Sequence, residues 1–282
     1  MLDGLRAGLK DLGLEEGRHF ALELRDLKGD LKAAAQAASG LERDKVNLIY
    51  SMATSVTLPV KQATTGVPIV FAVGSDPVAT GLVESFAKPG GRLTGTHQQG
   101  QDLTAKRLEI LKEVLPKLRR VITFYDSNNP VSQASAKLPR EAARQLRLDL
   151  VERKVSSVKE LQNGLKAFRA GEADAYFYVA DAMIISQAQL ILDTARAKRL
   201  PTMFNETAIV AKGALVSYGV SYHEAGRLTA KHVQRVLAGT SPRDLPVENV
   251  DRLELALNLR TARELGLAIP RQIRLRADKV IE

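Results

Sequence analysis

Short polar residues gather directly after the predicted strands of this chain. In the first half, Thr54 and Ser55 follow one strand and Asp76 follows the next. In parallel α/β sheets, ligands bind beyond the carboxyl ends of the strands, where helix N-termini offer free N–H groups to anions. The second half repeats the pattern at Asp126–Asn129, Asp181, Asn205 and Glu206. Each residue alone is more simply a helix cap, but together they predict a ligand-binding cleft.

Motifs for catalysis are nearly absent. The chain has no G-x-S-x-G, P-loop, H-E-x-x-H or calcium loop. It has no cysteine, which excludes thiolate nucleophiles, disulfides and cysteine-ligated metals. Its four histidines lack the spacing of metal ligands. We therefore expect a protein that binds a small molecule without catalytic residues, metal or cofactor.

The elements that must position these residues alternate between strands and helices almost from end to end. The alternation predicts parallel sheets covered by helices on both faces, an α/β fold. A helix is expected after Asp76-Pro77, and a half-buried strand at Phe20–Leu24. Further short apolar strands are predicted at 46–50, 68–73, 93–96, 121–125, 148–153, 175–179, 201–204 and 214–217.

Two series of these units predict two doubly wound lobes. The 282 residues suffice for two domains of ordinary size. We expect lobe 1 to comprise 1–96 with about 220–246, and lobe 2 to comprise 97–219 with about 247–282. The chain would then cross between the lobes near Gly95–Gln101, Tyr218–Tyr222 and Leu245–Val250, with the ligand held between them.

The charge balance is basic, with 41 Lys and Arg against 32 Asp and Glu and a net charge of +9. Aromatic residues make up only 5% of the chain, tryptophan is absent, and the basic residues are interspersed with acidic ones. Nucleic-acid binding is therefore disfavoured. Steering of an anionic small ligand, or solubility alone, accounts for the charge equally well.

Several motifs, in order, resemble a known family. The sequence is similar to the type I periplasmic substrate-binding proteins of ABC transporters, in the family that includes tryptophan- and tyrosine-binding members. The resemblance covers essentially the whole chain. It rests on Val67–Phe71, Ser75–Val78, Gly81–Val83, Lys88–Gly91, Thr94-Gly95, Lys106–Lys112, Pro201-Thr202, Gly213–Gly219, and Asn258–Ala262.

This resemblance implies the solute-binding component of an ABC importer. Such a protein clamps an amino acid, or an aromatic or carboxylate-bearing compound, between two lobes and delivers it to a membrane permease. It would act as a periplasmic or other extracytoplasmic protein, and we expect a monomer that binds no nucleic acid. The resemblance places the family's ligand loops on Thr54, Ser55, Asp76, Asn128, Asp181, Asn205 and Glu206.

Roles follow for some of these residues. Thr54 and Ser55, at a helix N-terminus, suit a ligand carboxylate, and Asp181 would suit an amino group. Phe204 or Tyr218 could stack on an apolar ligand body, although an ordinary place in the core is an equal alternative for both.

The sequence departs from the family at two points. The chain has His97 after Thr96, which puts a titratable group at the predicted lobe crossing, where relatives have a small residue or valine. It also opens with a helix, whereas family members begin with an export signal and an apolar strand. We therefore expect the natural polypeptide to extend before Met1, and a slot in the first sheet between Phe20–Leu24 and Val46–Tyr50.

Two other functions remain open from the sequence. The effector-sensing core of a transcription regulator shares this two-lobed architecture, and fold alone does not separate the two. An α/β enzyme, such as a nucleotide-sugar enzyme, is the weaker alternative because no phosphate loop or spaced catalytic acid pair is present.

Overall fold

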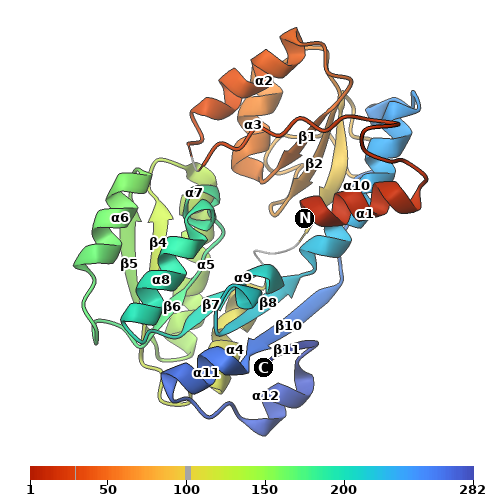
Figure 1. Cartoon of the computed structure of the whole chain (residues 1–282). Helices are drawn as coiled ribbons and strands as arrows, with labels where there is room; N and C mark the ends of the chain where they lie inside the picture. Colours follow the sequence, from red (N-terminus) through yellow and green to blue (C-terminus); the bar gives the residue numbers. More distant parts are fainter. Residues whose placement is uncertain (29, 99–102) are drawn as a thin grey trace. The chain divides into compact units, whose positions relative to one another are not determined.

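The computed structural model describes residues 1–28, 30–98 and 103–282, and the chain divides into two compact units (Figure 1). Unit 1 comprises Met1–Gln99 and Ser221–Arg252, and unit 2 comprises Gly100–Val220 and Leu253–Glu282. Residues 99–101 of the first predicted crossing lie outside the described residues. No helix in the described ranges is both long and apolar enough to cross a membrane.

The last crossing differs from the predicted one. Leu245–Val250 belongs wholly to unit 1, which continues to Arg252. Val247 is buried in the core of unit 1, and its N–H donates to the carbonyl of Phe86 at 2.8 Å. The segment thus leaves unit 1 only after it has added a short strand to that unit's sheet.

Unit 1 contains a four-stranded parallel sheet. Its strands run in the order β1 (Ile49–Met52), β2 (Ile69–Val73), β3 (Leu93–His97) and β9 (Glu248–Asn249). The helices of this unit are α1 (Leu2–Asp11), α2 (Ala33–Arg43), α3 (Thr54–Ala63) and α10 (Tyr222–Leu237), with a short 3-10 helix η1 (Pro242–Asp244).

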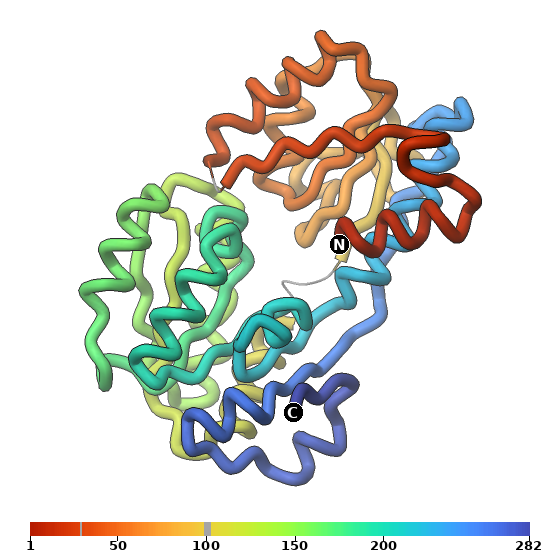
Figure 2. The backbone as a smooth tube through the Cα atoms, viewed as in Figure 1, coloured from red at the N-terminus to blue at the C-terminus, as the bar shows by residue number. Residues whose placement is uncertain are grey.

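Helices cover both faces of this sheet, as the continuous apolar run of β2 predicts. Ile69 and Phe71 of β2 point into one apolar cluster and Val70 into another. α1 lies alongside α10 (Figure 2). This close packing requires glycine, because a Cβ on Gly4 would stand 2.0 Å from the carbonyl oxygen of His223.

Two expectations for unit 1 are wrong, and a third stays a prediction. Phe20–Leu24 forms no strand, and Leu24 is 60% exposed. The expected slot beside Val46–Tyr50 is not tested by the strand pairing, because β1 lies at the edge of the sheet and pairs only with β2 among the described strands. No helix follows Asp76-Pro77: a single turn ends at Gly81, which has a φ of 72°. Alternation alone does not form a strand, because a strand also needs a neighbour to which its backbone can bond.

Unit 2 contains a seven-stranded mixed sheet in the order β11-β10-β8-β7-β6-β4-β5. β10 is antiparallel to β8, and the other pairs are parallel. The strands are β4 (Arg120–Asp126), β5 (Asp149–Val155), β6 (Ala175–Phe177), β7 (Thr202–Phe204), β8 (Val216–Val220), β10 (Leu253–Asn258) and β11 (Lys279–Ile281). The helices are α4 (Thr104–Val114), α5 (Pro130–Gln145), α6 (Val158–Ala167), α7 (Ala182–Ser186), α8 (Ala188–Ala197), α9 (Thr207–Ala211), α11 (Leu259–Leu265) and α12 (Arg271–Arg276).

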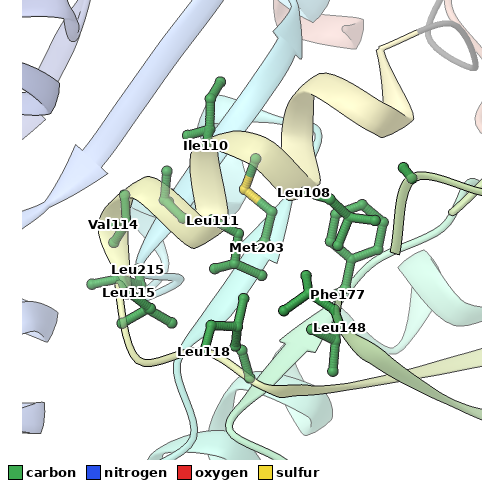
Figure 3. Close-up of a cluster of buried hydrophobic side chains, with 14 of the residues drawn as sticks. Leu108, Ile110, Leu111, Val114, Leu115, Leu118, Leu148, Phe177, Met203 and Leu215 are labelled. Atoms are coloured by element: carbon green, nitrogen blue, oxygen red, sulfur yellow. The ribbon is translucent and has the colours of Figure 1, made fainter. Parts of the chain in front are cut away.

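One apolar cluster on each face holds unit 2 together. On one face Leu108 and Leu111 of α4 pack with Phe177 of β6, Met203 of β7 and Leu215, which directly precedes β8 (Figure 3). Burial of each leucine or phenylalanine side chain stabilises the unit by about 1.5–3 kcal/mol. The core therefore fixes the strand ends, from which the polar loops emerge.

Candidate functional site

The predicted polar residues of unit 1 follow the ends of three adjacent parallel strands. Thr54 and Ser55 follow β1, Asp76 follows β2, and His97 ends β3. Because β1, β2 and β3 are parallel neighbours, their carboxyl ends lie at one edge of the sheet. The structure thus brings these residues to the same edge of unit 1.

The N-terminus of α3 is the most distinctive feature of this edge. Ala53, the residue before the helix, has φ 71° and ψ 141°, a conformation essentially restricted to glycine. Its carbonyl accepts both the N–H (2.9 Å) and the hydroxyl (2.8 Å) of Thr57. The N–H groups of Thr54 and Ser55 belong to the first helical turn, which has no intrahelical acceptors. The strained turn therefore presents free donors at the positive end of the helix dipole.

The Thr54 side chain adds a second sign of an anion site. Thr54 is only 3% exposed, and its hydroxyl has no hydrogen-bond partner among the described residues. A buried hydroxyl without a partner is costly, so this group is stabilised when a ligand supplies the missing hydrogen bond. A carboxylate would satisfy the hydroxyl and the free N–H groups together.

Asp76 and His97 complete the edge. Oδ1 of Asp76 accepts the N–H groups of Val78 (2.8 Å) and Ala79 (3.1 Å), and the side chain is otherwise exposed. The imidazole of His97 lies against the ring of Phe86, with 4.8 Å between centroids. Partial burial lowers the pKa of His97, and the nearby charge of Asp76 opposes that shift.

The predicted polar residues of unit 2 also follow parallel strands. Asn128 follows β4, Asp181 follows β6, and Asn205 with Glu206 follows β7. Asn128 is exposed and donates its N–H to Asp126 Oδ1 at 2.8 Å. The carboxyl ends of these strands share one edge of the second sheet, although β6 separates β4 from β7.

Asp181 is deeply engaged within unit 2. It is 4% exposed, and Oδ1 accepts the N–H groups of Met183 (2.9 Å) and Ile184 (3.0 Å), which caps α7. Oδ2 accepts the N–H of Asp126 at 2.6 Å and so ties β4 to the loop after β6. Burial raises the pKa of Asp181, and the backbone hydrogen bonds oppose that shift. These contacts give Asp181 the capping role that the sequence offered as its alternative.

The two aromatic candidates differ in their surroundings. Phe204 is fully buried, stacked on Tyr178 with 5.5 Å between centroids and packed near Tyr176. Its place in the core removes it from the ligand-binding candidates, which corrects the stacking role considered for it. Tyr218, near the end of β8, is only partly buried against the other apolar cluster and remains a candidate.

Asn205 and Glu206 are half-buried at the end of β7. A Cβ on Gly219 would stand 2.2 Å from the carbonyl oxygen of Asn205, so a glycine is needed where β8 passes this loop. Burial raises the pKa of Glu206, against the opposing charge of Lys212. A partly buried carboxyl group at a strand end is a group that a polar ligand could engage.

Sequence reasoning missed the residues that set this geometry. Ala53 carries the strained turn, yet an alanine gives no sequence signal of a positive φ. Tyr178 positions the Asp181 loop, because its hydroxyl accepts the N–H of Asp181 at 2.9 Å and donates to its carbonyl at 3.0 Å. Phe86 lies beside His97 but is eleven positions away in the chain.

Comparisons with known proteins agree over nearly the whole chain. A family model for ABC transporter substrate binding protein matches residues 1–281. A tyrosine-binding protein of Clostridioides difficile (strain R20291) is 27% identical over 264 residues, which cover 94% of this chain and 76% of that protein. These matches confirm the family resemblance derived from the sequence motifs.

Solved structures show the same fold. A conserved domain protein from Vibrio cholerae is 27% identical, with a TM-score of 0.87 over 99% of this chain and 93% of that one. An ABC domain from Streptococcus pneumoniae, solved in complex with L-Trp, is 24% identical, with a TM-score of 0.85 over 99% and 94% of the two chains. The predicted α/β fold of the periplasmic-binding-protein type is thereby confirmed.

Proposed function

We propose that this chain, which belongs to the ABC transporter substrate-binding protein family, binds an aromatic amino acid for import. Its two units would close on the ligand, and the loaded protein would deliver it to a membrane permease outside the cytoplasm. Binding is the whole of its role in this proposal, with no chemical step. The family match and the polar strand ends in both units support it.

The N-terminus of α3 carries the proposal. It combines the strained Ala53, the free N–H groups of Thr54 and Ser55, and a buried Thr54 hydroxyl without a partner. A ligand carboxylate is the group that such a site binds best, because it accepts several hydrogen bonds and carries the charge that the helix dipole favours. We assign the carboxylate of the ligand to this position.

Two observations favour an aromatic side chain on the ligand. The relative from C. difficile is a tyrosine-binding protein, and the fold neighbour from S. pneumoniae was solved with L-Trp. In this chain, Phe86 is 37% exposed against His97 in unit 1, and Tyr218 is half-exposed in unit 2. Such rings can stack on an aromatic ligand. Contacts of the ligand with Asp76, Asn128, Asn205 and Glu206, and of its amino group with Asp181, remain predictions.

Calorimetric titration with three matched ligands tests the carboxylate assignment. L-Tyrosine has both charged groups, tyramine lacks the carboxylate, and 3-(4-hydroxyphenyl)propionate lacks the amino group. We expect tyramine to lose more affinity than the propionate does, and Thr54→Val to weaken L-tyrosine about tenfold. The control is Thr64→Val at the residue that follows the same helix, where the hydroxyl donates to the Val60 carbonyl.

Two results would overturn the proposal. Tyramine binding as tightly as L-tyrosine would remove the carboxylate from the site. Absence of saturable binding of L-tyrosine, L-tryptophan and L-phenylalanine would remove the aromatic amino acids as the ligand class.

A further inference from the structure

The net charge of the chain lies almost entirely in unit 2. This unit contains 25 of the 41 Lys and Arg residues and 17 of the 32 Asp and Glu residues, so it carries +8 of the total +9. Much of the excess lies in the loops that lead into the strands, at the edge of the sheet opposite the strand ends described above. These loops contain Lys117, Arg119, Arg147, Arg169, Lys198, Arg199 and Lys212, and Arg120 is the first residue of β4.

A cavity of about 200 Å³ opens at this basic edge. It lies between the end of α8, the start of β7 and α11, entirely within unit 2. Leu192, Leu200 and Leu265 form apolar walls. Its polar lining comprises Arg196, Arg199, Thr202, Thr261 and Glu264. We call this cavity the arginine pocket.

The charges of the arginine pocket are not balanced. Glu264 lies 3.8 Å from Nε of Arg196 and 3.6 Å from Nε of the neighbouring Arg260. The guanidinium of Arg199 has no ion pair or hydrogen bond to any described residue. The residues that line the pocket include two guanidinium groups, those of Arg196 and Arg199, and one carboxylate, which leaves one positive charge in excess for a ligand to neutralise.

A hydroxyl donor is also present. Thr202 is 3% exposed, and its Oγ1 accepts the N–H of Leu215 at 3.1 Å, which leaves the O–H proton free to be donated. The hydroxyl of Thr261 is occupied, since it donates to the carbonyl of Gly213 at 3.1 Å. Among the described residues, the guanidinium groups of Arg196 and Arg199 and the O–H of Thr202 have no hydrogen-bond acceptor, so these are the donors that a ligand could use.

We propose that the arginine pocket is a second binding site, for the phosphate group of an organic phosphate. A phosphate group carries the negative charge that this excess attracts, and its oxygens suit guanidinium groups, which bind phosphate in a fixed fork geometry. The leucine walls accommodate the organic part of the ligand. The arginine pocket does not depend on the proposed amino-acid site. All its residues lie in unit 2, at the edge of the sheet opposite the strand ends that carry Asn128, Asp181 and Asn205.

The same chemistry could come from two sources, a soluble phosphate monoester or the headgroup of an anionic lipid. The experiment separates them. The full-length protein is titrated by calorimetry with inorganic phosphate and with glycerol 3-phosphate, and is tested for co-sedimentation with phosphatidylglycerol and phosphatidylcholine vesicles. Each measurement is made on the wild type, Arg199→Gln and the control Arg169→Gln, which removes one charge from the same edge outside the pocket.

We expect saturable binding of glycerol 3-phosphate or of phosphatidylglycerol vesicles, weakened about tenfold by Arg199→Gln and unchanged by Arg169→Gln. Binding of the soluble phosphates identifies the first source, and binding of the vesicles alone identifies the second. Equal losses of affinity in Arg199→Gln and Arg169→Gln would show that binding depends on the overall charge of this edge, and would overturn the proposed site. Absence of binding in every arm would overturn it as well. L-Tyrosine binding should be unchanged in both variants, which separates this outcome from the fate of the proposed function.

Discussion

Thr54 in unit 1 and Asp181 in unit 2 hold corresponding places, each near a helix N-terminus that follows a parallel strand. Both are almost fully buried, but their hydrogen bonding is opposite. Asp181 accepts three backbone N–H groups of its own unit, whereas the Thr54 hydroxyl has no partner among the described residues. A polar residue after a strand is therefore available to a ligand only where the fold leaves it without a hydrogen-bond partner.

The charges of the two units show a second contrast. Unit 1 carries 16 Lys and Arg residues against 15 Asp and Glu, while unit 2 carries an excess of eight positive charges. Net charge steers association but does not specify a fold. In the proposals above, unit 1 binds a single carboxylate through the N–H groups and the hydroxyl at the start of α3. Unit 2 instead attracts anions through the basic loops at one edge of its sheet.

Asp181→Ala should have the largest effect on stability. It leaves three backbone N–H groups without their acceptor, and each buried donor without a partner costs about 1–3 kcal/mol. Partial solvation of the α7 terminus reduces the sum, so we expect a loss of about 3 kcal/mol in the free energy of unfolding of unit 2, measured by urea denaturation. Asp193→Ala, an exposed position on α8, is the control and should change stability little.

Asp181→Ala also tests whether Asp181 differs from Thr54 in its role toward the ligand. If Asp181 is a cap, the affinity for L-tyrosine stays unchanged at temperatures where the variant is folded. A loss of affinity for L-tyrosine without a loss for 3-(4-hydroxyphenyl)propionate would instead make Asp181 the partner of the amino group.

Thr54→Val should separate binding from stability. The valine methyl replaces a hydroxyl that has no partner, so the ligand-free protein should gain about 1 kcal/mol of stability. Affinity for L-tyrosine should fall about tenfold in the same variant. Urea denaturation without ligand and calorimetry with L-tyrosine measure the two effects. A loss of ligand-free stability would mean that the Thr54 hydroxyl is bonded within unit 1, as Asp181 is within unit 2.

Ala53→Gly should stabilise unit 1 by about 1 kcal/mol. A non-glycine residue in this conformation costs about 1–3 kcal/mol, and the greater freedom of glycine in the unfolded chain cancels part of the gain. The control Ala35→Gly, inside α2, should destabilise by about 1 kcal/mol. Thermal unfolding of both variants shows whether each substitution raises or lowers the stability. A destabilised Ala53→Gly variant would show that the turn is not strained.

Much of this fold was predictable because its signals are local. The buried run Ile69–Val73 and the alternating helices predicted parallel sheets, and the structure has them. Phe20–Leu24 failed as a strand because pairing depends on a neighbour that a local pattern does not reveal. The polar residues that follow the strands were also predictable, because polar side chains directly after an apolar run are a local feature of the sequence.

Which candidate residues are already buried or hydrogen-bonded within the protein was not predictable. Asp181 and Thr54 look alike in sequence. Asp181 also accepts the N–H of Asp126, 55 positions away, and the local sequence does not indicate this hydrogen bond. The sequence allowed Phe204 a stacking role on a ligand, but its ring packs against Tyr176 and Tyr178 in the core. These distinctions arise from contacts across strands, which the sequence order does not contain.

His97 should give unit 1 a small pH dependence. Partial burial lowers its pKa in the folded state, so the unfolded chain, with an ordinary histidine pKa near about 6.5, binds the proton more readily. Stability therefore falls as the pH falls through about 6.5 and levels off below the folded-state pKa. This dependence of stability on pH should disappear in His97→Gln. It should persist in His223→Gln, because His223 is exposed on α10. Urea midpoints of the three proteins between pH 5 and pH 8 measure the effect. Identical slopes in the wild type and His97→Gln would show that the contact with Phe86 leaves His97 as well solvated as in the unfolded chain.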